Sequence, residues 1–176
     1  MYHTVVIGGG CLGAATAISL QKKLHKTNKK EKVCLIEKSV LCAAESSRHS
    51  GIVRAANADN DASIMASLST DFWSDLRKVW GVEMETEKFG AIWIAKNNQD
   101  GENPVWEELS ERMKKINLVF EKIDKNSTIE KCSDTIITSD SEAYYYEPAA
   151  LQIDPSILRS TIYDALDDSG VDVMEK

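Results

Sequence analysis

A glycine-rich turn near the N-terminus constrains the fold of this chain more than any other feature. The apolar run at residues 5–7 leads directly into Gly8, Gly10 and Gly13, which have the spacing G-x-G-x-x-G. In such a turn the first glycine permits the tight bend, the second leaves room for a pyrophosphate, and the third lets a helix pack closely on the strand. A helix beginning here also directs its N–H groups and the positive end of its dipole toward an anion. The pattern therefore predicts a dinucleotide-binding turn.

The residues after the turn supply the context that a lone glycine pattern lacks. A helical pattern covers residues 12–24, and a second apolar strand at residues 32–36 ends on Glu37. The acid lies close to the spacing of about 20 residues at which a carboxylate accepts hydrogen bonds from a ribose. A glycine-rich turn in some other α/β protein is the alternative interpretation. The complete order of strand, turn, helix, strand and acid argues against it.

Composition and charge exclude several classes of partner. The chain of 176 residues is 43% hydrophobic and 28% charged, as expected for a globular protein with one core, and its net charge is −7. An acidic chain is unsuited to a nucleic-acid surface, so we expect no nucleic-acid partner. Residues 5–20 are apolar but lack the charged start of a signal peptide, and we expect no membrane span.

The four cysteines, at positions 11, 34, 42 and 132, include no C-x-x-C pair. This spacing argues against a zinc site, and we expect no metal. It suggests no disulfide framework either, which favours a reducing compartment. We therefore expect an intracellular protein, in the cytoplasm or the mitochondrial matrix. Cys11 lies inside the glycine turn, where it could touch a cofactor without reacting.

Beyond the first βαβ unit, the periodicity predicts a mixed series of helices and strands. The expected helices cover residues 61–80, 105–116 and 155–168, and the expected strands cover residues 89–95, 118–123 and 171–173. We expect an α/β fold, with a Rossmann-like βαβ domain interrupted by a mixed α+β insertion. Its parts would be residues 1–58 for the dinucleotide, residues 59–150 for an incomplete substrate or cap domain, and residues 151–176 for the return to the first domain.

Three local expectations concern caps and the core. Asp154 is expected to cap the last helix, because Pro155 suits the first helical position. Ser127 is a candidate cap for a single helical turn. The apolar residues of helix 61–80, its aromatic residues included, are expected to pack in the core. The short apolar run at residues 135–138 has no clear type.

The segment between residues 38 and 58 follows no helical or strand period and is rich in small residues. Its centre reads Ser-Ser-Arg-His-Ser-Gly-Ile-Val-Arg, from Ser46 to Arg54. A long irregular segment inside a compact domain is often functional, and this one is not of low complexity. We therefore expect it to contribute to the site.

At this loop the sequence resembles the D-amino-acid oxidase-like superfamily of FAD-dependent oxidoreductases. That superfamily includes sarcosine and glycine oxidases and dimethylglycine and 2-hydroxyglutarate dehydrogenases. Four features carry the resemblance: the glycine turn, Glu37-Lys38, the loop Ser46–Arg54, and the segment from Glu147-Pro148 to Ile153-Asp154-Pro155. The loop is similar to the pattern S-x-x-x-S-G-x-x followed by Arg or His. The order of the four features covers nearly the whole chain.

The resemblance implies a role in FAD binding for each matching residue. It implies pyrophosphate, ribose and flavin contacts for Gly8, Gly10, Cys11, Leu12, Gly13, Glu37, Lys38, Ser46, Ser47, Arg48, His49, Ser50 and Gly51. Arg48 or Arg54 would offset the negative charge of phosphate or of reduced flavin, and a surface or structural ion pair is the alternative for each. No catalytic residue is implied.

His49 raises the question of how the flavin would be held. Some members attach FAD through a histidine in this region, but here His49 precedes Ser-Gly directly, which differs from that register. We therefore expect non-covalent FAD. A histidine beside the flavin could also tune its redox state, because its protonation responds to small shifts near neutral pH.

The resemblance also implies a completing partner. Members of the superfamily are about twice as long, so we expect a C-terminal segment or a second subunit to complete the sheet and the substrate pocket. Residues 1–176 alone are then not expected to be an independently stable domain, because a parallel sheet needs both faces covered.

The implied activity is FAD-dependent oxidation of a small amine, amino acid or hydroxy acid, by hydride transfer to the flavin. The enzyme would be an oxidase or a dehydrogenase, and the substrate a small molecule. Two alternatives remain open: a stand-alone NAD-binding regulatory module, and a non-catalytic subunit of a split oxidoreductase. Glu37 would suit NAD over NADP, whereas the loop after it argues against a simple NAD fold.

Overall fold

The computed structural model describes residues 2–57, 59–74, 76–132 and 137–176. In chain order its elements are β1 (Tyr2–Ile7), α1 (Cys11–Lys26), β2 (Lys32–Glu37), η1 (Glu45–Ser47), β3 (Ile52–Val53), α2 (Asn60–Ser74), α3 (Leu76–Trp80), β4 (Thr86–Glu87), β5 (Ala91–Lys96), α4 (Pro104–Lys115), β6 (Glu121–Ile123), α5 (Lys125–Cys132), β7 (Glu142–Glu147), β8 (Leu151–Ile153), α6 (Pro155–Ser169) and β9 (Asp172–Glu175). The chain forms two compact units. The first comprises Met1–Gly51, Asp75–Thr86 and Ile153–Lys176, and the second Ile52–Ser74 and Glu87–Gln152.

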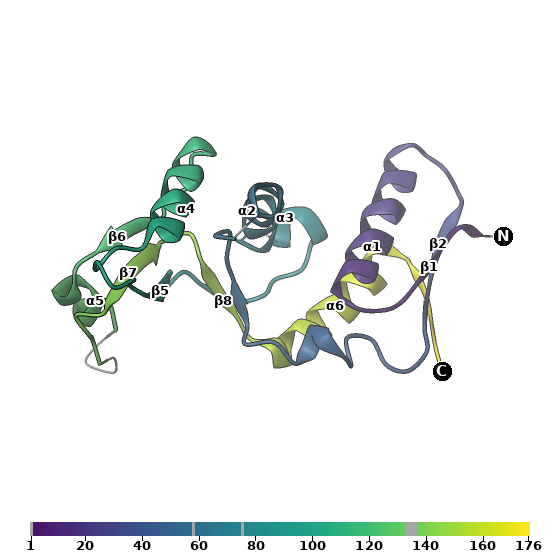
Figure 1. Ribbon diagram of the computed structural model, residues 1–176. Coiled ribbons are helices and arrows are strands. Elements are labelled where there is room, and N and C mark those ends of the chain that lie inside the picture. The colour runs from purple at the N-terminus through teal and green to yellow at the C-terminus, as the bar shows by residue number, and fades with distance from the viewer. Residues whose placement is uncertain (1, 58, 75, 133–136) are drawn as a thin grey trace. The chain divides into compact units, whose positions relative to one another are not determined.

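The first unit contains a parallel sheet with the strand order β1-β2-β9 (Figure 1). Val5 lies opposite Cys34 in one ladder, and Leu35 lies opposite Val173 in the other. Residues 33–35 of the central strand are fully buried, as is typical of a parallel strand covered on its faces. Helices α1 and α6 pack against each other in this unit. The sheet and helices confirm the predicted α/β, Rossmann-like fold.

Helix α1 packs through small residues and one buried amide. Ala14, Ala17 and Ile18 are completely buried on one face, so the helix backbone approaches the sheet closely. Gln21 is also completely buried, and its Oε1 accepts a hydrogen bond from the backbone N–H of Val33 at 2.7 Å. This contact satisfies a buried polar group and ties α1 to β2.

Both ends of α6 are capped, and the N-terminal cap is the one that the sequence predicts. The Oδ1 atom of Asp154 accepts a hydrogen bond from the backbone N–H of Ser156 at 2.8 Å, and Pro155 opens the helix. Gly170 ends it with φ of 74°, the left-handed conformation favoured at a helix C-terminus. The prediction of a capped helix after Asp154 is confirmed.

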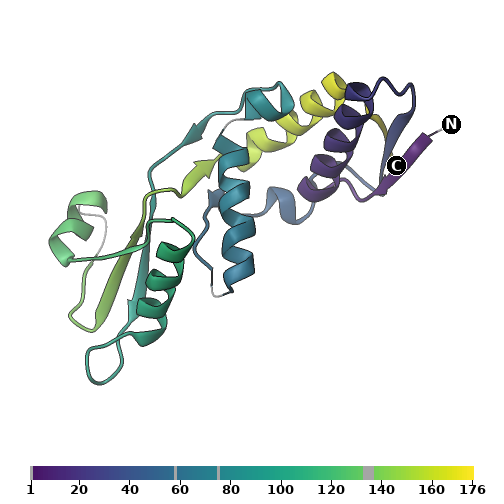
Figure 2. The same ribbon diagram turned by 90° about the horizontal axis from the view of Figure 1, so that it is seen from above.

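The second unit is built on an antiparallel sheet with the order β5-β7-β6, and α4 packs on one face of it (Figures 1 and 2). Leu109 and Met113 of α4 enter a core that contains Phe120 and Tyr145. The rings of Phe120 and Tyr145 stack, with their centroids 5.3 Å apart. This aromatic stacking stabilises the helix on the sheet. A small separate sheet has the order β3-β8-β4.

A buried carboxylate links the aromatic core to the segment after β3. Glu147, at the end of β7, is only 1% exposed. Its Oε1 accepts hydrogen bonds from the backbone N–H groups of Ala55 and Ala56 at 2.5 and 3.1 Å, and its Oε2 accepts one from the indole of Trp93 at 3.0 Å. Three donors therefore offset the cost of burying this side chain.

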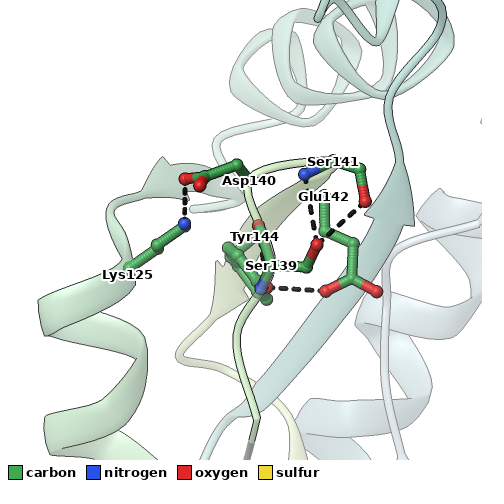
Figure 3. Close-up of polar contacts among 6 residues, drawn as sticks. All are labelled: Lys125, Ser139, Asp140, Ser141, Glu142 and Tyr144. Carbon is green, nitrogen blue, oxygen red and sulfur yellow. Dashed lines mark hydrogen bonds and ion pairs between the residues drawn. The ribbon is translucent and has the colours of Figure 1, made fainter.

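The turn that leads into β7 is organised by short polar side chains (Figure 3). The Tyr144 hydroxyl donates to Glu142 Oε2 at 2.7 Å and accepts from the backbone N–H of Ser139 at 2.7 Å. Asp140 forms an ion pair with Lys125 at the start of α5. These contacts fix the entry to the strand and mark this turn as structural.

The structure corrects two local expectations. The described residues of the segment predicted as a helix over 61–80 are helical, as α2 and α3, but only α3 is well buried, through Leu76 and Trp80. In α2, Met65 and Leu68 are more than 60% exposed. The buried face of α2 instead carries two hydroxyl residues, Ser63 and Thr70. Their hydroxyls donate to carbonyls of the preceding turn, which makes burial of this face possible.

The cap of α5 is Asp124 rather than Ser127. The Oδ1 atom of Asp124 accepts a hydrogen bond from the backbone N–H of Ser127 at 2.8 Å, so the serine is the capped residue. The apolar run at residues 135–138 lies partly outside the described residues. Among the helices that the structure describes, none is long and apolar enough to cross a membrane.

Candidate functional site

The glycine turn between β1 and α1 is tightly closed. The N–H of Gly8 donates to the carbonyl of Ile36 at 2.8 Å, and Gly8 has a φ of 105°, which favours glycine. A Cβ atom on Gly13 would lie only 1.8 Å from the Gly8 carbonyl oxygen. The first and third glycines are therefore required by the backbone itself, independently of any ligand.

The second glycine brings the turn into contact with the serine-rich loop. A Cβ atom on Gly10 would lie 3.1 Å from the hydroxyl oxygen of Ser46, which belongs to η1. That oxygen also accepts a hydrogen bond from the backbone N–H of Cys11 at 3.0 Å. The loop and the turn, 35 residues apart in sequence, thus meet at the N-terminus of α1.

The carboxylate of Glu37 lies against the same turn. Its Oε2 accepts a hydrogen bond from the N–H of Gly9 at 2.7 Å, and its Oε1 accepts one from the N–H of Ser39 at 3.0 Å. The bond from Gly9 lowers the pKa of Glu37, with a smaller contribution from Ser39 in the same direction. The side chain is therefore an anionic acceptor at neutral pH, at the edge of the sheet where the two strands end.

A pocket of about 250 Å³ lies beside this turn, entirely in the first unit. Its lining includes four residues predicted for cofactor binding: Gly10, Glu37, Lys38 and Ser46. It also includes five others from the loop that follows β2: Ser39, Val40, Cys42, Ala43 and Ala44. The volume would enclose part of a dinucleotide, since pockets for whole ligands of drug size start at about 300 Å³.

The loop that forms one wall of the pocket is held by residues far away in the sequence. The N–H of Leu41 donates to Oε1 of Glu175 at 2.6 Å, and the hydroxyl of Tyr163 donates to the same oxygen at 2.5 Å. The Nε of Arg159 donates to the carbonyl of Leu41 at 3.1 Å. Sequence reasoning missed this support, because no local pattern relates α6 and β9 to the loop.

The other predicted residues lie around the pocket without lining it. Cys11 is partly buried, and Leu12 is 87% exposed. In the serine-rich loop, the predicted residues Ser47, Arg48, His49 and Ser50 are exposed. Nδ1 of His49 accepts a hydrogen bond from the N–H of Gly51 at 2.9 Å, which fixes the unprotonated ring nitrogen.

Gly51 anchors the end of the serine-rich loop. It is buried, has a φ of 78°, and a Cβ atom there would lie 2.2 Å from the carbonyl oxygen of Ile153. The N–H of Ile153 in turn donates to the carbonyl of Gly51 at 2.9 Å. Two of the sequence features that carry the resemblance, far apart in the chain, therefore form one backbone contact.

Arg54 belongs to the second unit and is engaged there. Its guanidinium lies 4.3 Å from the centroid of the Trp93 ring, and its Nη1 donates to the carbonyl of Ala56 at 2.8 Å. It lines a cavity of about 500 Å³ together with Trp93, Trp106 and Arg112. These contacts are a cation–π interaction and a hydrogen bond, and neither is the ion pair considered from the sequence. No group of three or more metal-ligating side chains occurs within the described ranges.

We expect Glu37→Ala to weaken FAD binding by roughly ten- to a hundredfold, the effect of removing hydrogen bonds to a charged acceptor. The measurement is a fluorescence titration of the whole apoprotein with FAD. Glu45→Ala is the matched control, because Glu45 is an exposed acid in the same loop. An unchanged affinity in Glu37→Ala would rule out a ribose contact and leave Glu37 as a brace for Gly9 and Ser39.

Comparison with known proteins places this geometry in a known family. A family model described as FAD dependent oxidoreductase matches residues 3–176. The structure is similar to L-proline dehydrogenase from P. horikoshii, with a TM-score of 0.83 at 19% identity, and to L-amino acid deaminase from Proteus vulgaris, with a TM-score of 0.81 at 18% identity. It is also similar to glycine oxidase from Geobacillus kaustophilus, with a TM-score of 0.79 at 18% identity. No curated protein sequence matches significantly.

Coverage differs between the chain and these structures. In each case 99% of this chain is matched, but only 44%, 40% and 46% of the proline dehydrogenase, the deaminase and the glycine oxidase. The chain thus spans less than half the length of these structures. At such low identity the similarity establishes the fold.

Proposed function

Because this chain belongs to the family of FAD-dependent oxidoreductases, we propose that it forms the dinucleotide-binding part of an enzyme that oxidises a small amine, amino acid or hydroxy acid. The membership confirms the resemblance to the D-amino-acid oxidase-like superfamily. The observation that carries the proposal is the pocket beside the glycine turn, where Gly10, Glu37 and Ser46 meet.

The residues of the pocket fit an FAD molecule by their chemistry. At Gly10 a Cβ atom would already be close to Ser46, so only glycine leaves the approach to the backbone open. Glu37 offers an ionised acceptor for ribose hydroxyls, and Lys38 places a cation at the pocket wall. The N-terminus of α1 favours the pyrophosphate by its dipole. A dinucleotide requires this combination: a helix N-terminus that binds the pyrophosphate, and beside it a carboxylate that accepts hydrogen bonds from the ribose hydroxyls.

On this proposal, each of the predicted site residues contacts a particular part of the cofactor. Gly8, Gly10, Leu12 and Gly13 admit the pyrophosphate, with Cys11 beside it, and Glu37 orients the ribose. Residues 46–51 extend along the rest of the cofactor, with Arg48 offsetting negative charge. We propose that FAD is held without a covalent bond, since His49 uses Nδ1 to accept from Gly51. When bound, FAD supplies the hydride acceptor of the reaction.

The named relatives favour an amino acid among the three substrate classes. The matched structures are called a proline dehydrogenase, an amino acid deaminase and a glycine oxidase. We propose an amino acid or a related amine as substrate, and a further segment or subunit that completes the substrate pocket. The coverage of 40–46% of the relatives' lengths supports this completion.

The experiment is to purify the whole protein with FAD, remove oxygen, and add amino acids, N-methylated amines and 2-hydroxy acids in turn. We expect loss of the visible absorbance band of the oxidised flavin with one amino acid or amine, and recovery on admitting an acceptor. A protein that binds NAD but no FAD would overturn the proposal in favour of an NAD module. FAD that no substrate of the three classes reduces would favour a non-catalytic subunit.

A further inference from the structure

Two of the four cysteines meet at the glycine turn. Cys11 is the first residue of α1, and Cys42 lies in the loop after β2 that lines the pocket. The N–H of Cys42 donates to the carbonyl of Gly9 at 2.9 Å, and its Sγ lies 3.7 Å from the same oxygen. The N–H of Cys11 donates to the hydroxyl oxygen of Ser46 at 3.0 Å, and Ser46 and Cys42 line the same pocket. Cys11 and Cys42 are therefore both held at the glycine turn, although they lie far apart in the sequence.

The backbone of Cys42 is unusual for this residue type. It has a φ of 56°, in the left-handed region that residues other than glycine seldom occupy. Cys42 is 2% exposed, so its thiol is held in one place by the packing around it. Such a conformation persists only where the surrounding structure imposes it, and it occurs often at functional positions.

The two thiols have opposite acid–base character. The Cys42 side chain lowers the pKa of Cys11 to about 6, with further lowering from the Ser46 hydroxyl, against burial. The same pairing, together with burial and the nearby Glu37 carboxylate, raises the pKa of Cys42 although Arg159 opposes this. The opposite shifts favour Cys11 as the thiolate nucleophile and Cys42 as the thiol that resolves its oxidised form.

We propose that Cys11 and Cys42 are an oxidation site at which a hydroperoxide forms a disulfide across the dinucleotide turn and thereby reduces cofactor binding. In the first step the Cys11 thiolate attacks the peroxide, the O–O bond breaks, and with one proton the products are Cys11 sulfenic acid and water. In the second step the Cys42 sulfur attacks the Cys11 sulfur and water leaves. The two thiols lose two electrons in total, and the peroxide gains them.

The position of the pair explains the effect on the cofactor. Cys42 lines the pocket and Cys11 is the first residue of α1 beside it, so a bond between their sulfur atoms ties the pocket loop to the start of α1. A disulfide requires its Cβ atoms to lie about 3.5–4.5 Å apart, which leaves little freedom for the loop to admit a pyrophosphate. The other two cysteines do not line the pocket: Cys34 lies on β2 and Cys132 in the second unit. They are internal controls for oxidation at Cys11 and Cys42.

The test uses the whole protein, reduced, freed of FAD and treated with hydrogen peroxide. Free thiols are then alkylated, and the digest is analysed by mass spectrometry. We expect a cross-linked peptide pair containing Cys11 and Cys42, and none after treatment with dithiothreitol. Cys132→Ser is the matched control and should give the same cross-link. Cys42→Ser should give no cross-link and should leave Cys11 as a sulfenic acid that dimedone traps.

The second readout is FAD affinity before and after oxidation. We expect the oxidised protein to bind FAD on the order of tenfold more weakly, because the crosslink fixes the pocket wall, and dithiothreitol to restore the affinity. Peroxide that oxidises Cys132 but leaves Cys11 and Cys42 reduced would overturn the proposal. A disulfide without any change in FAD affinity would overturn its effect on binding. The cross-link is measured without FAD. A failure of the proposed FAD-binding function would therefore not change the result for the disulfide.

Discussion

Gly13→Ala is expected to lower the free energy of unfolding of the first unit by about 3 kcal/mol or more, beyond the usual cost of overpacking. The added Cβ atom would lie 1.8 Å from the carbonyl oxygen of Gly8 and 3.0 Å from its carbon. Both are backbone atoms, so no side-chain rotation relieves the clash. Gly8 is itself fixed by its bond to Ile36 and by its positive φ. The strand and the helix must therefore separate.

The measurement is denaturant unfolding of the whole protein, followed by circular dichroism. Ser19→Ala is the matched control, because Ser19 is exposed on the same helix and its change should stay within about 0.5 kcal/mol. A Gly13→Ala variant that unfolds at the same midpoint as the wild type would contradict the close packing of α1 on β1.

Glu147→Ala is expected to destabilise the second unit by about 3 kcal/mol or more. The change leaves the N–H groups of Ala55 and Ala56 and the indole N–H of Trp93 without their acceptor, and each unsatisfied buried donor costs about 1–3 kcal/mol. It also opens a space in a core that includes the aromatic residues beside Trp93.

Two further variants separate the hydrogen bonds from the charge. Glu147→Gln keeps one oxygen acceptor but directs an amide N–H₂ at a donor, so its loss should fall between those of the wild type and Glu147→Ala. Glu121→Ala, an exposed acid on the neighbouring β6, is the control and should change little. Thermal unfolding of the whole protein measures all three. Equal stability of Glu147→Ala and Glu121→Ala would show that the buried carboxylate contributes nothing.

The first βαβ unit could be predicted because its signals are local. A strand, a glycine turn, a small-residue helix face and a terminal acid each follow from neighbouring residues, and the turn at Gly8 and Gly13 has the strict steric requirement that the pattern implies. The cap at Asp154 followed from the proline after it. The position of Glu37 at the end of β2 was also expected, although its bonds to Gly9 and Ser39 were not.

The remainder could not be predicted because it depends on contacts between distant residues. In the sequence, Glu147 is part of a Glu-Pro motif. No neighbouring residue indicates that its carboxylate accepts hydrogen bonds from backbone N–H groups 91–92 residues earlier. Glu175 braces the pocket loop from the last strand. In α2 the apolar residues suggested a core face, but burial followed Ser63 and Thr70 instead. The expected division at residues 58 and 150 stays a prediction.

The central claim is that the glycine turn of this chain holds FAD. The measurement that tests it most directly is a titration of the whole apoprotein with FAD, for the wild type and for Gly10→Val. We predict about one equivalent of FAD for the wild type and no detectable binding for Gly10→Val, because a branched side chain would fill the space beside Ser46 that the pyrophosphate needs. Circular dichroism would check that the variant remains folded. A wild-type protein that binds no FAD, or a folded Gly10→Val that binds it equally well, would contradict the account.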